Sequence, residues 1–150
     1  MTKLITVFTP TYNRAYCLHQ VYQSLLRQTN KGFIWVIVDD GSTDKTKELV
    51  SSWITESKIE IRYIYQENQG MHGAHNTAYS NITTALNVCI DSDDFMPDNA
   101  IEVIENKWNT ISDKENIAGL IGNNIFKDGK VVGTEIPKTL QQTTLFDLYN

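Results

Sequence analysis

Three carboxylates lie within a short stretch of the chain, Asp91-Ser92-Asp93-Asp94. Asp91, Asp93 and Asp94 would repel one another unless they are solvated, protonated or bridged by a cation. A hard divalent metal takes oxygen ligands of this kind and commonly completes its shell with waters and substrate phosphates. The pattern therefore fits a metal and diphosphate site, and a solvated acidic loop before a helix is the alternative.

Two further polar segments follow apolar runs. Pro10-Thr11-Tyr12-Asn13-Arg14 follows the run 4–9, and Asp39-Asp40-Gly41-Ser42-Thr43-Asp44 follows the continuous apolar run 33–38. A run like 33–38 is typical of a central strand covered on both faces. Because ligands of open α/β sheets bind beyond the carboxyl ends of the strands, these segments are candidates for a binding site.

Strand-like and helical runs alternate from the start of the chain, which is the signature of a parallel sheet with crossover helices. The fold class is therefore α/β. Apolar residues recur at helical spacing between the strands. The expected strands are 4–9, 33–38, 59–65 and 85–90, and the expected helices lie around 18–26, 47–53 and 74–81.

The later part of the chain predicts one more helix and a hairpin. Pro97 suits the first turn of a helix because its missing N–H needs no partner there, and apolar residues between Ile101 and Trp108 mark the buried face of that helix. A β-hairpin is expected over 117–136, with Asp128-Gly129 supplying the positive φ of its turn. Residues 143–149 resemble the opening of a further helix.

Composition places the chain among ordinary globular proteins. It has 150 residues, of which 41% are hydrophobic and 21% charged, and this fits a single domain over 1–150. A formal charge of -5 without a basic run argues against nucleic acid as a partner. No apolar stretch of about 20 residues and no signal-peptide pattern occurs. Cys17 and Cys89 are expected to be buried thiols, as in a reducing cytosol.

The polar segments occur in the order and at the spacing of a known family. Pro10-Thr11-Tyr12-Asn13 comes first, Val38 to Asp44 second and Asp91 to Asp94 last, with Gln66-Glu67-Asn68-Gln69-Gly70 and Asn76 between them. Over residues 3–110 this pattern resembles the family 2 inverting glycosyltransferases. The resemblance implies a GT-A fold, which is a Rossmann-like, open and mainly parallel sheet with helices on both faces, here truncated on its C-terminal, acceptor side.

The resemblance also implies how a nucleotide is held. The Tyr12 ring would pack against the base, and Asp40 would accept a hydrogen bond from the base N–H, which fits uracil and so a UDP-sugar donor. Asp39 is the alternative for that contact, and a core aromatic is the alternative for Tyr12. The nucleotide-binding set implied in this way is Pro10, Thr11, Tyr12, Asn13, Asp39, Asp40, Asp91 and Ser92.

By the same resemblance, Asp93 would be the principal ligand of Mn²⁺ or Mg²⁺, with Asp91 near both the ribose and the metal and Asp94 as a neighbouring ligand. The metal would neutralise charge on the leaving diphosphate. Four further residues are expected near the donor: Arg14, Gly70, His72 and Asn76.

Alternatives remain for two of these residues. A solvated arginine at a helix start is the alternative for Arg14. His72 and His75 are three residues apart, as metal-binding pairs can be, but no carboxylate or third histidine joins them in the sequence. A polar loop beside the sugar is therefore the preferred interpretation of the segment around His72.

The expected reaction is transfer of the sugar, with inversion, to a saccharide or lipid-linked hydroxyl that a carboxylate base deprotonates. No convincing base follows Asp94, so we expect it beyond Asn150, and a donor-binding fragment without activity is an alternative. The parent enzyme is expected in the cytoplasm, peripheral to the inner face of the membrane. A Mg²⁺-dependent phosphoryl-transfer or signalling domain is a third possibility. Such sites need an aspartate after the first strand, where this chain has Pro10 to Asn13.

Overall fold

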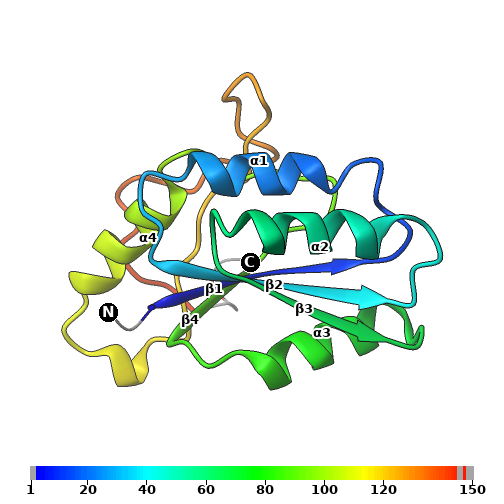
Figure 1. Ribbon diagram of the computed structural model, residues 1–150. Coiled ribbons are helices and arrows are strands. Elements are labelled where there is room, and N and C mark those ends of the chain that lie inside the picture. Colours follow the sequence, from blue (N-terminus) through cyan, green and yellow to red (C-terminus); the bar gives the residue numbers. More distant parts are fainter. Residues whose placement is uncertain (1–2, 145–146, 148–150) are drawn as a thin grey trace. The chain divides into compact units, whose positions relative to one another are not determined.

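The computed structural model describes residues 3–144 and 147, and the chain forms two compact units, 1–115 and 116–150. The first unit contains a four-stranded sheet with the order β3-β2-β1-β4, in which neighbouring strands pair in parallel (Figure 1). The elements are β1 (Ile5–Thr11), α1 (His19–Arg27), β2 (Phe33–Asp40), α2 (Thr46–Glu56), β3 (Ile61–Gln66), α3 (Gly70–Asn81), β4 (Leu86–Cys89), α4 (Ala100–Asn109) and a 3₁₀ turn (Lys114–Asn116).

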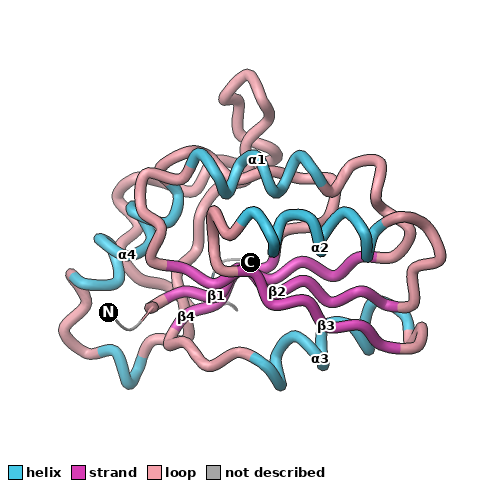
Figure 2. The backbone as a smooth tube through the Cα atoms, viewed as in Figure 1, coloured by secondary structure: helices cyan, strands magenta, loops and turns pink. Residues whose placement is uncertain are grey.

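Helices cover both faces of this sheet. Figure 2 shows α1 and α2 on one side of the strands and α3 on the other. Trp35 and Ile37 pack in the core beneath α1 and α2, whereas Val36 and Val38 pack against α3. Because β2 is buried on both faces, its continuous apolar run is explained. The predicted α/β class with a parallel sheet is confirmed.

The order of the strands places a topological switch beside β1. The chain passes from β1 through α1 to β2 and through α2 to β3, and then returns through α3 to pair β4 with the opposite side of β1. Open α/β sheets bind ligands beyond the carboxyl ends of the strands at such a switch. The fold therefore directs attention to the segments that follow β1, β2 and β4.

Several element boundaries differ from those predicted. β1 continues to Thr11, and α3 begins at Gly70 rather than near Ala74, so that Gly70 and His72 belong to the helix. α4 begins at Ala100 and not at Pro97, whose carbonyl accepts a hydrogen bond from the Ala100 N–H at 3.0 Å. Pro97 therefore belongs to the turn that leads into the helix.

The predicted hairpin over 117–136 is wrong in extent. In the described part of the second unit it is reduced to one antiparallel bridge, Ile125 to Val131, although Gly129 has the expected positive φ of 84°. Side chains from 121 to 130 are exposed, and a two-stranded hairpin with no buried face is marginal in water. The helix expected at 143–149 lies mostly outside the described residues.

Three aromatic rings form the centre of the core beneath α1 and α2. Tyr22 and Trp53 stack with centroids 4.3 Å apart, and Trp35 stacks beside both at 6.2 and 5.9 Å. The Trp35 indole N–H donates to Thr9 Oγ1 at 3.0 Å. Burial and a hydrogen bond to Glu56 raise the pKa of Tyr22 to about 12. This cluster joins α1 and α2 to β2.

We expect Trp53→Ala to lower the free energy of unfolding by about 3 kcal/mol, because it empties one position of a stack of three buried rings. Urea unfolding followed by far-ultraviolet circular dichroism measures this loss. The exposed neighbour Ile54, on the same helix, provides the control, and Ile54→Ala should cost less than about 0.5 kcal/mol. Equal losses in the two variants would contradict the assigned core.

Cys89 gives a prediction on pH. Burial, and secondarily the negative charge of Asp91, raise the pKa of its thiol from 9.0 to about 11. The folded state therefore favours the neutral thiol, and the resulting stabilisation is present below pH 9 and is lost as the pH rises through about 11. In Cys17→Ser, alkylation of native Cys89 by iodoacetamide should rise with an inflection near pH 11, against one near pH 9 in urea. An inflection near pH 9 for alkylation of the native protein would contradict the raised pKa of Cys89.

Candidate functional site

The polar segments after β1, β2 and β4 leave the sheet at one edge. Thr11, the last residue of β1, pairs with Asp39 of β2, and Phe8 of β1 pairs with Cys89 of β4. The Ile90 N–H donates to the Phe8 carbonyl at 2.9 Å, so that pairing continues up to the acidic segment. The sheet thus brings together three segments that lie far apart in the sequence.

The alternation of side chains along β2 assigns its two terminal aspartates to different faces. Asp39 follows Ile37 by two residues and so lies on the face covered by α1 and α2. Asp40 follows Val38, which packs against Ala74 of α3, and so lies on the face of α3. The two carboxylates therefore have different surroundings.

Asp39 is fully buried, with 0% of its surface exposed. Its Oδ1 accepts a hydrogen bond from the Ser42 N–H at 2.8 Å, and its Oδ2 accepts one from the Tyr63 hydroxyl. Burial, together with the hydrogen bond to this carboxylate, raises the pKa of Tyr63 well above its ordinary value. Both oxygens of Asp39 are thus engaged within the protein, and they shape the turn that follows β2.

Asp40 is 4% exposed and is held differently. Both donors to its side chain reach the same oxygen, because the Gln66 amide and the Gln69 N–H bond to Oδ1 at 2.7 and 2.9 Å. Asn68 donates to the Asp40 carbonyl at 2.9 Å. Gly41 follows with a φ of 84°, and a side chain there would meet the backbone of Asn68. The protein therefore holds one carboxylate oxygen of Asp40, Oδ1, and neither of these two donors reaches Oδ2.

Asn13 joins the loops after β1 and β2. It has a left-handed φ of 52°, its N–H donates to Ser42 Oγ at 2.8 Å, and its Oδ1 accepts the N–H groups of Thr43 and Asp44 at 2.8 and 3.2 Å. In return, Asp44 Oδ2 accepts the Ala15 N–H at 3.0 Å. The amide of Asn13, expected among the nucleotide-binding residues, thus contacts the neighbouring loop.

Asp44 also bonds to the beginning of α2. Its Oδ1 accepts the Thr46 hydroxyl at 2.6 Å and the Thr46 N–H at 3.0 Å. Partial burial opposes ionisation of Asp44, but these hydrogen bonds and the one from Ala15 outweigh it, and the pKa of Asp44 is lowered. An ionised Asp44 therefore connects the loop after β1 to α2.

Tyr12 lies between the buried Thr11 and Asn13, the residue that joins the two loops. Its side chain is 49% exposed, so it is not a core aromatic. Thr11 is buried, and its Oγ1 has no hydrogen-bond partner among the described residues. Pro10 is half-buried. The ring of Tyr12 is thus exposed at the edge of the sheet, directly after the buried end of β1.

The acidic segment is exposed at its three carboxylates, whereas Ser92 between them is buried. The Asp94 N–H donates to the Asp91 carbonyl at 3.0 Å, which folds the segment into a turn. Burial, followed by the charges of Asp91 and Asp93, raises the pKa of Asp94. The segment therefore concentrates negative charge at the end of β4.

Arg14 extends from the loop after β1 toward this charge. Its Nη1 lies 3.6 Å from Asp93 Oδ2 and donates to the Tyr16 hydroxyl at 2.5 Å. The hydrogen bond with Tyr16 is the main cause of the raised pKa of Arg14, and the charge of Asp93 adds to it. Arg14 thus connects the segment after β1 with the acidic segment.

A metal at this place would need ligands from outside the protein. In the ranges 3–144 and 147, no group of three or more His, Cys, Asp or Glu side chains is arranged to hold a metal ion. The carboxylate oxygens of the acidic segment nevertheless suit a hard cation that keeps waters and takes substrate phosphates as ligands. The donor set fits a metal that arrives with a diphosphate.

The residues expected near the sugar lie on α3. Gly70 opens this helix with a φ of 76°, and a side chain there would meet nothing within 4 Å. His72 and Asn76, one turn apart, are exposed. His75 instead packs edge-on against Phe8, with centroids 5.4 Å apart. His72 and His75 therefore have different surroundings.

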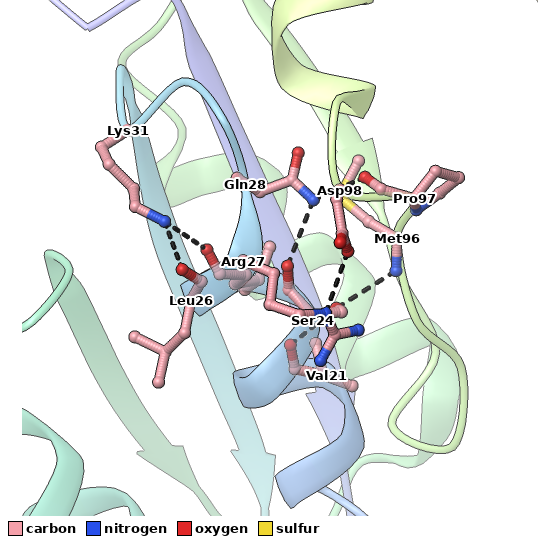
Figure 3. Close-up of polar contacts among 10 residues, drawn as sticks. Val21, Ser24, Leu26, Arg27, Gln28, Lys31, Met96, Pro97 and Asp98 are labelled. Atoms are coloured by element: carbon pink, nitrogen blue, oxygen red, sulfur yellow. Dashed lines mark hydrogen bonds and ion pairs between the residues drawn. The ribbon is translucent and has the colours of Figure 1, made fainter.

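Sequence reasoning missed the residues that anchor the acidic segment from behind. Ser24 and Gln28 of the α1 region bind the backbone of Met96 and Pro97 (Figure 3). Ser24 lies three residues after the buried Val21, and Gln28 lies three residues after the buried Leu25, so both follow the apolar stripe of α1. Because buried polar groups are normally hydrogen-bonded, polar residues on an apolar stripe were the available signal.

No helix in the described part of the chain is both long enough and apolar enough to cross a membrane. Both cysteines are free thiols.

Comparison with known proteins gives consistent results. The sequence profile described as Glycosyl transferase family 2 matches residues 6–140. The glycosyltransferase GlyA of Streptococcus pneumoniae serotype 4 is 36% identical over 103 residues, which make up 69% of this chain and 15% of GlyA. This chain thus spans only a small part of the length of that relative.

Two solved structures share the fold. S. aureus TarS 1-349 in complex with UDP-GlcNAc has a TM-score of 0.67 at 25% identity, over 71% of this chain and 31% of TarS. The mannosyltransferase PcManGT from Pyrobaculum calidifontis, in complex with GDP-Man and Mn²⁺, has a TM-score of 0.62 at 27% identity, over 73% of this chain and 32% of PcManGT. Together with the profile match over most of its length, these similarities identify the chain as a member of glycosyl transferase family 2 with the GT-A fold.

Proposed function

We propose that this chain binds a UDP-sugar together with Mn²⁺ or Mg²⁺, and that the protein to which it belongs transfers the sugar, with inversion, to a saccharide or lipid-linked hydroxyl. The observation that carries the proposal is the convergence of Tyr12, Asp40 and the acidic segment at one edge of the sheet, beside β1. Family membership supplies the reaction class. The solved complexes of TarS with UDP-GlcNAc and of PcManGT with Mn²⁺ support a nucleotide-sugar donor and a metal.

In this proposal the base is held by Tyr12 and Asp40. The exposed ring of Tyr12 packs against the face of the base. Asp40 accepts the uracil N3–H on Oδ2, since its protein donors both reach Oδ1. Asp39 is the weaker candidate because Ser42 and Tyr63 engage both of its oxygens. Asn13 contributes by holding the loop in place, and the buried Thr11 lies directly before Tyr12.

The diphosphate lies at the acidic segment. A bound divalent metal would stabilise the negative charge that develops on the leaving nucleoside diphosphate. Asp93 is proposed as its principal ligand, with Asp91 and Asp94 beside it. Arg14, which lies 3.6 Å from Asp93, is placed to contact the diphosphate oxygens once that carboxylate binds the metal. Gly70, His72 and Asn76 of α3 would border the sugar.

Three carboxylates after the acidic segment already have partners within the protein, which makes them poor candidates for the general base. Glu102 accepts the Thr29 hydroxyl at 2.6 Å, Glu105 accepts the Asn30 amide, and Asp128 pairs with Lys130. We therefore assign donor binding to this chain and leave activation of the acceptor to the whole protein. The two free thiols suit a reducing compartment, so we place the activity in the cytoplasm, at the inner membrane face when the acceptor is lipid-linked.

For the metal site, we expect Asp93→Ala to weaken UDP binding in the presence of Mn²⁺ about tenfold or more, which is about 1.4 kcal/mol, because a ligand shared with the diphosphate is lost. Titration calorimetry with Mn²⁺ and with EDTA measures the effect. Asp98→Ala is a matched control, because this exposed carboxylate pairs with Arg27 at 3.0 Å on the other side of the turn. Unchanged, metal-independent affinity in Asp93→Ala would remove the metal site from the proposal.

For the base, we expect the protein to bind UDP more tightly than CDP, since cytosine has no N3–H. Asp40→Asn should narrow this preference about tenfold, because an amide N–H then faces the uracil N3–H. Asp39→Asn is the matched control. It should lower stability but leave the ratio of UDP to CDP affinity unchanged. If Asp39→Asn changes the ratio and Asp40→Asn does not, the two roles are exchanged.

A further inference from the structure

Gln28, the C-cap residue directly after α1, is a buried polar side chain at a junction between distant segments. It is 2% exposed. Its side-chain amide both donates a hydrogen bond to the segment that follows the acidic residues and accepts one from it. Nε2 donates to the Pro97 carbonyl at 2.7 Å and to the Ser24 carbonyl at 3.2 Å. Oε1 accepts the Ile101 N–H at 3.0 Å. The amide thus joins α1 to the turn before α4 and to the first turn of α4 itself.

Ser24 adds a second buried bond at the same junction. Its hydroxyl donates to the Val21 carbonyl at 2.8 Å and accepts the Met96 N–H at 3.1 Å. Figure 3 shows Ser24 and Gln28 directed from α1 toward Met96 and Pro97. Together they hold the backbone at Met96, Pro97 and Ile101 against α1.

These bonds fix one end of the acidic segment, and the sheet fixes the other. On the N-terminal side, the Ile90 N–H donates to the Phe8 carbonyl at 2.9 Å. Residues 91–95 span the interval between the two anchors and contain the turn closed by the Asp94 N–H. Because three like charges in this interval repel one another, their spacing depends on how firmly the two ends are held.

Two other side-chain contacts between the same elements are exposed. The ion pair of Arg27 with Asp98 has side chains 52% and 59% exposed, and the Thr29 hydroxyl bonds to Glu102 at the surface. Exposed pairs of this kind contribute little because water competes for both partners. Gln28 differs because its loss leaves the buried Ile101 N–H without its acceptor. Compared with these two exposed contacts, the buried amide of Gln28 is better able to set the position of the segment.

We propose that Gln28 is a positioning residue for the donor site, which sets the spacing of Asp91, Asp93 and Asp94 by fixing the chain that follows them to the end of α1. The proposal rests on the proposed function where it concerns the metal and the diphosphate. Residues that orient metal ligands without touching the metal commonly change metal affinity by about 10- to 100-fold when they are replaced. Gln28 acts in the same way, through the backbone.

The test compares Gln28→Met, which keeps the side-chain volume and removes the hydrogen bonds, with the wild-type chain and with Arg27→Ala. UDP affinity is measured with Mn²⁺ and with EDTA, uridine affinity is measured alone, and hydrogen exchange is measured at the Asp94 amide. In Gln28→Met we expect the gain in UDP affinity from Mn²⁺ to fall about tenfold, uridine affinity to stay unchanged, and exchange at Asp94 to accelerate. Arg27→Ala should behave as the wild type.

Ser24→Ala provides a second, milder variant if Gln28→Met does not fold, because it removes only the bonds to Val21 and Met96. It should change the same quantities in the same direction. The positioning role of Gln28 is overturned if either folded variant keeps the wild-type gain in UDP affinity from Mn²⁺ and the wild-type hydrogen exchange at Asp94. An equal loss of uridine and UDP affinity also overturns it. If the wild-type chain shows no metal-dependent UDP binding, the proposed function fails, and exchange at Asp94 alone then decides whether Gln28 positions the segment.

Discussion

Two carboxylates are buried at the end of β2, and much of the surrounding structure serves to accommodate them. A buried carboxylate is tolerated only when hydrogen bonds replace its lost hydration. Asp39 and Asp40 point to opposite faces of the sheet, so their donors must come from both sides. The donors belong to the turn after β2, to β3 and to the residue before α3: Ser42, Tyr63, Gln66 and Gln69. These bonds hold β3 and the start of α3 in register with β2.

The polar residues at this edge divide into those that build the loops and those that remain available to a ligand. The side-chain oxygens of Asn13, Asp39 and Asp44 accept hydrogen bonds from neighbouring backbone and hydroxyl groups. Tyr12 and Asp93 remain exposed. A family pattern contains both kinds together, because a binding site requires rigid loops as well as contacting groups. The loops are held in place here because the side chains of Asn13, Asp39 and Asp44 each have hydrogen-bond partners.

The acidic segment shows the same division between support and exposure. Its carboxylates lie in water, where their mutual repulsion is weakened, while the chain on either side is held by buried hydrogen bonds. Burial is the main cause of the raised pKa of Asp94, and the repulsion that remains from Asp91 and Asp93 adds to it. A cation that binds here would relieve this repulsion, and hydrogen bonds at Ile90 and Ile101 hold the chain on either side of the three charges.

The sequence by itself determined the α/β class, the parallel sheet, most strand positions and the grouping of three polar segments at strand ends, because these follow from periodicity and from local runs of apolar residues. Helix and strand boundaries near Gly70 and Pro97, and the extent of the hairpin over 117–136, were less predictable. They depend on contacts with other elements, which the exposed hairpin lacks.

Only the tertiary structure decided which polar groups hold the fold. The partners of Asn13, Asp40 and Gln28 lie on other elements, about 30 to 70 residues away along the chain, so no local pattern could reveal that Asn13 joins two loops or that Gln28 anchors α4. It likewise separated Asp39 from Asp40, which are adjacent in the sequence and equivalent in type. The pleat of β2 directs their side chains to opposite faces of the sheet. Different side chains lie on these two faces, so the two carboxylates have different hydrogen-bond partners.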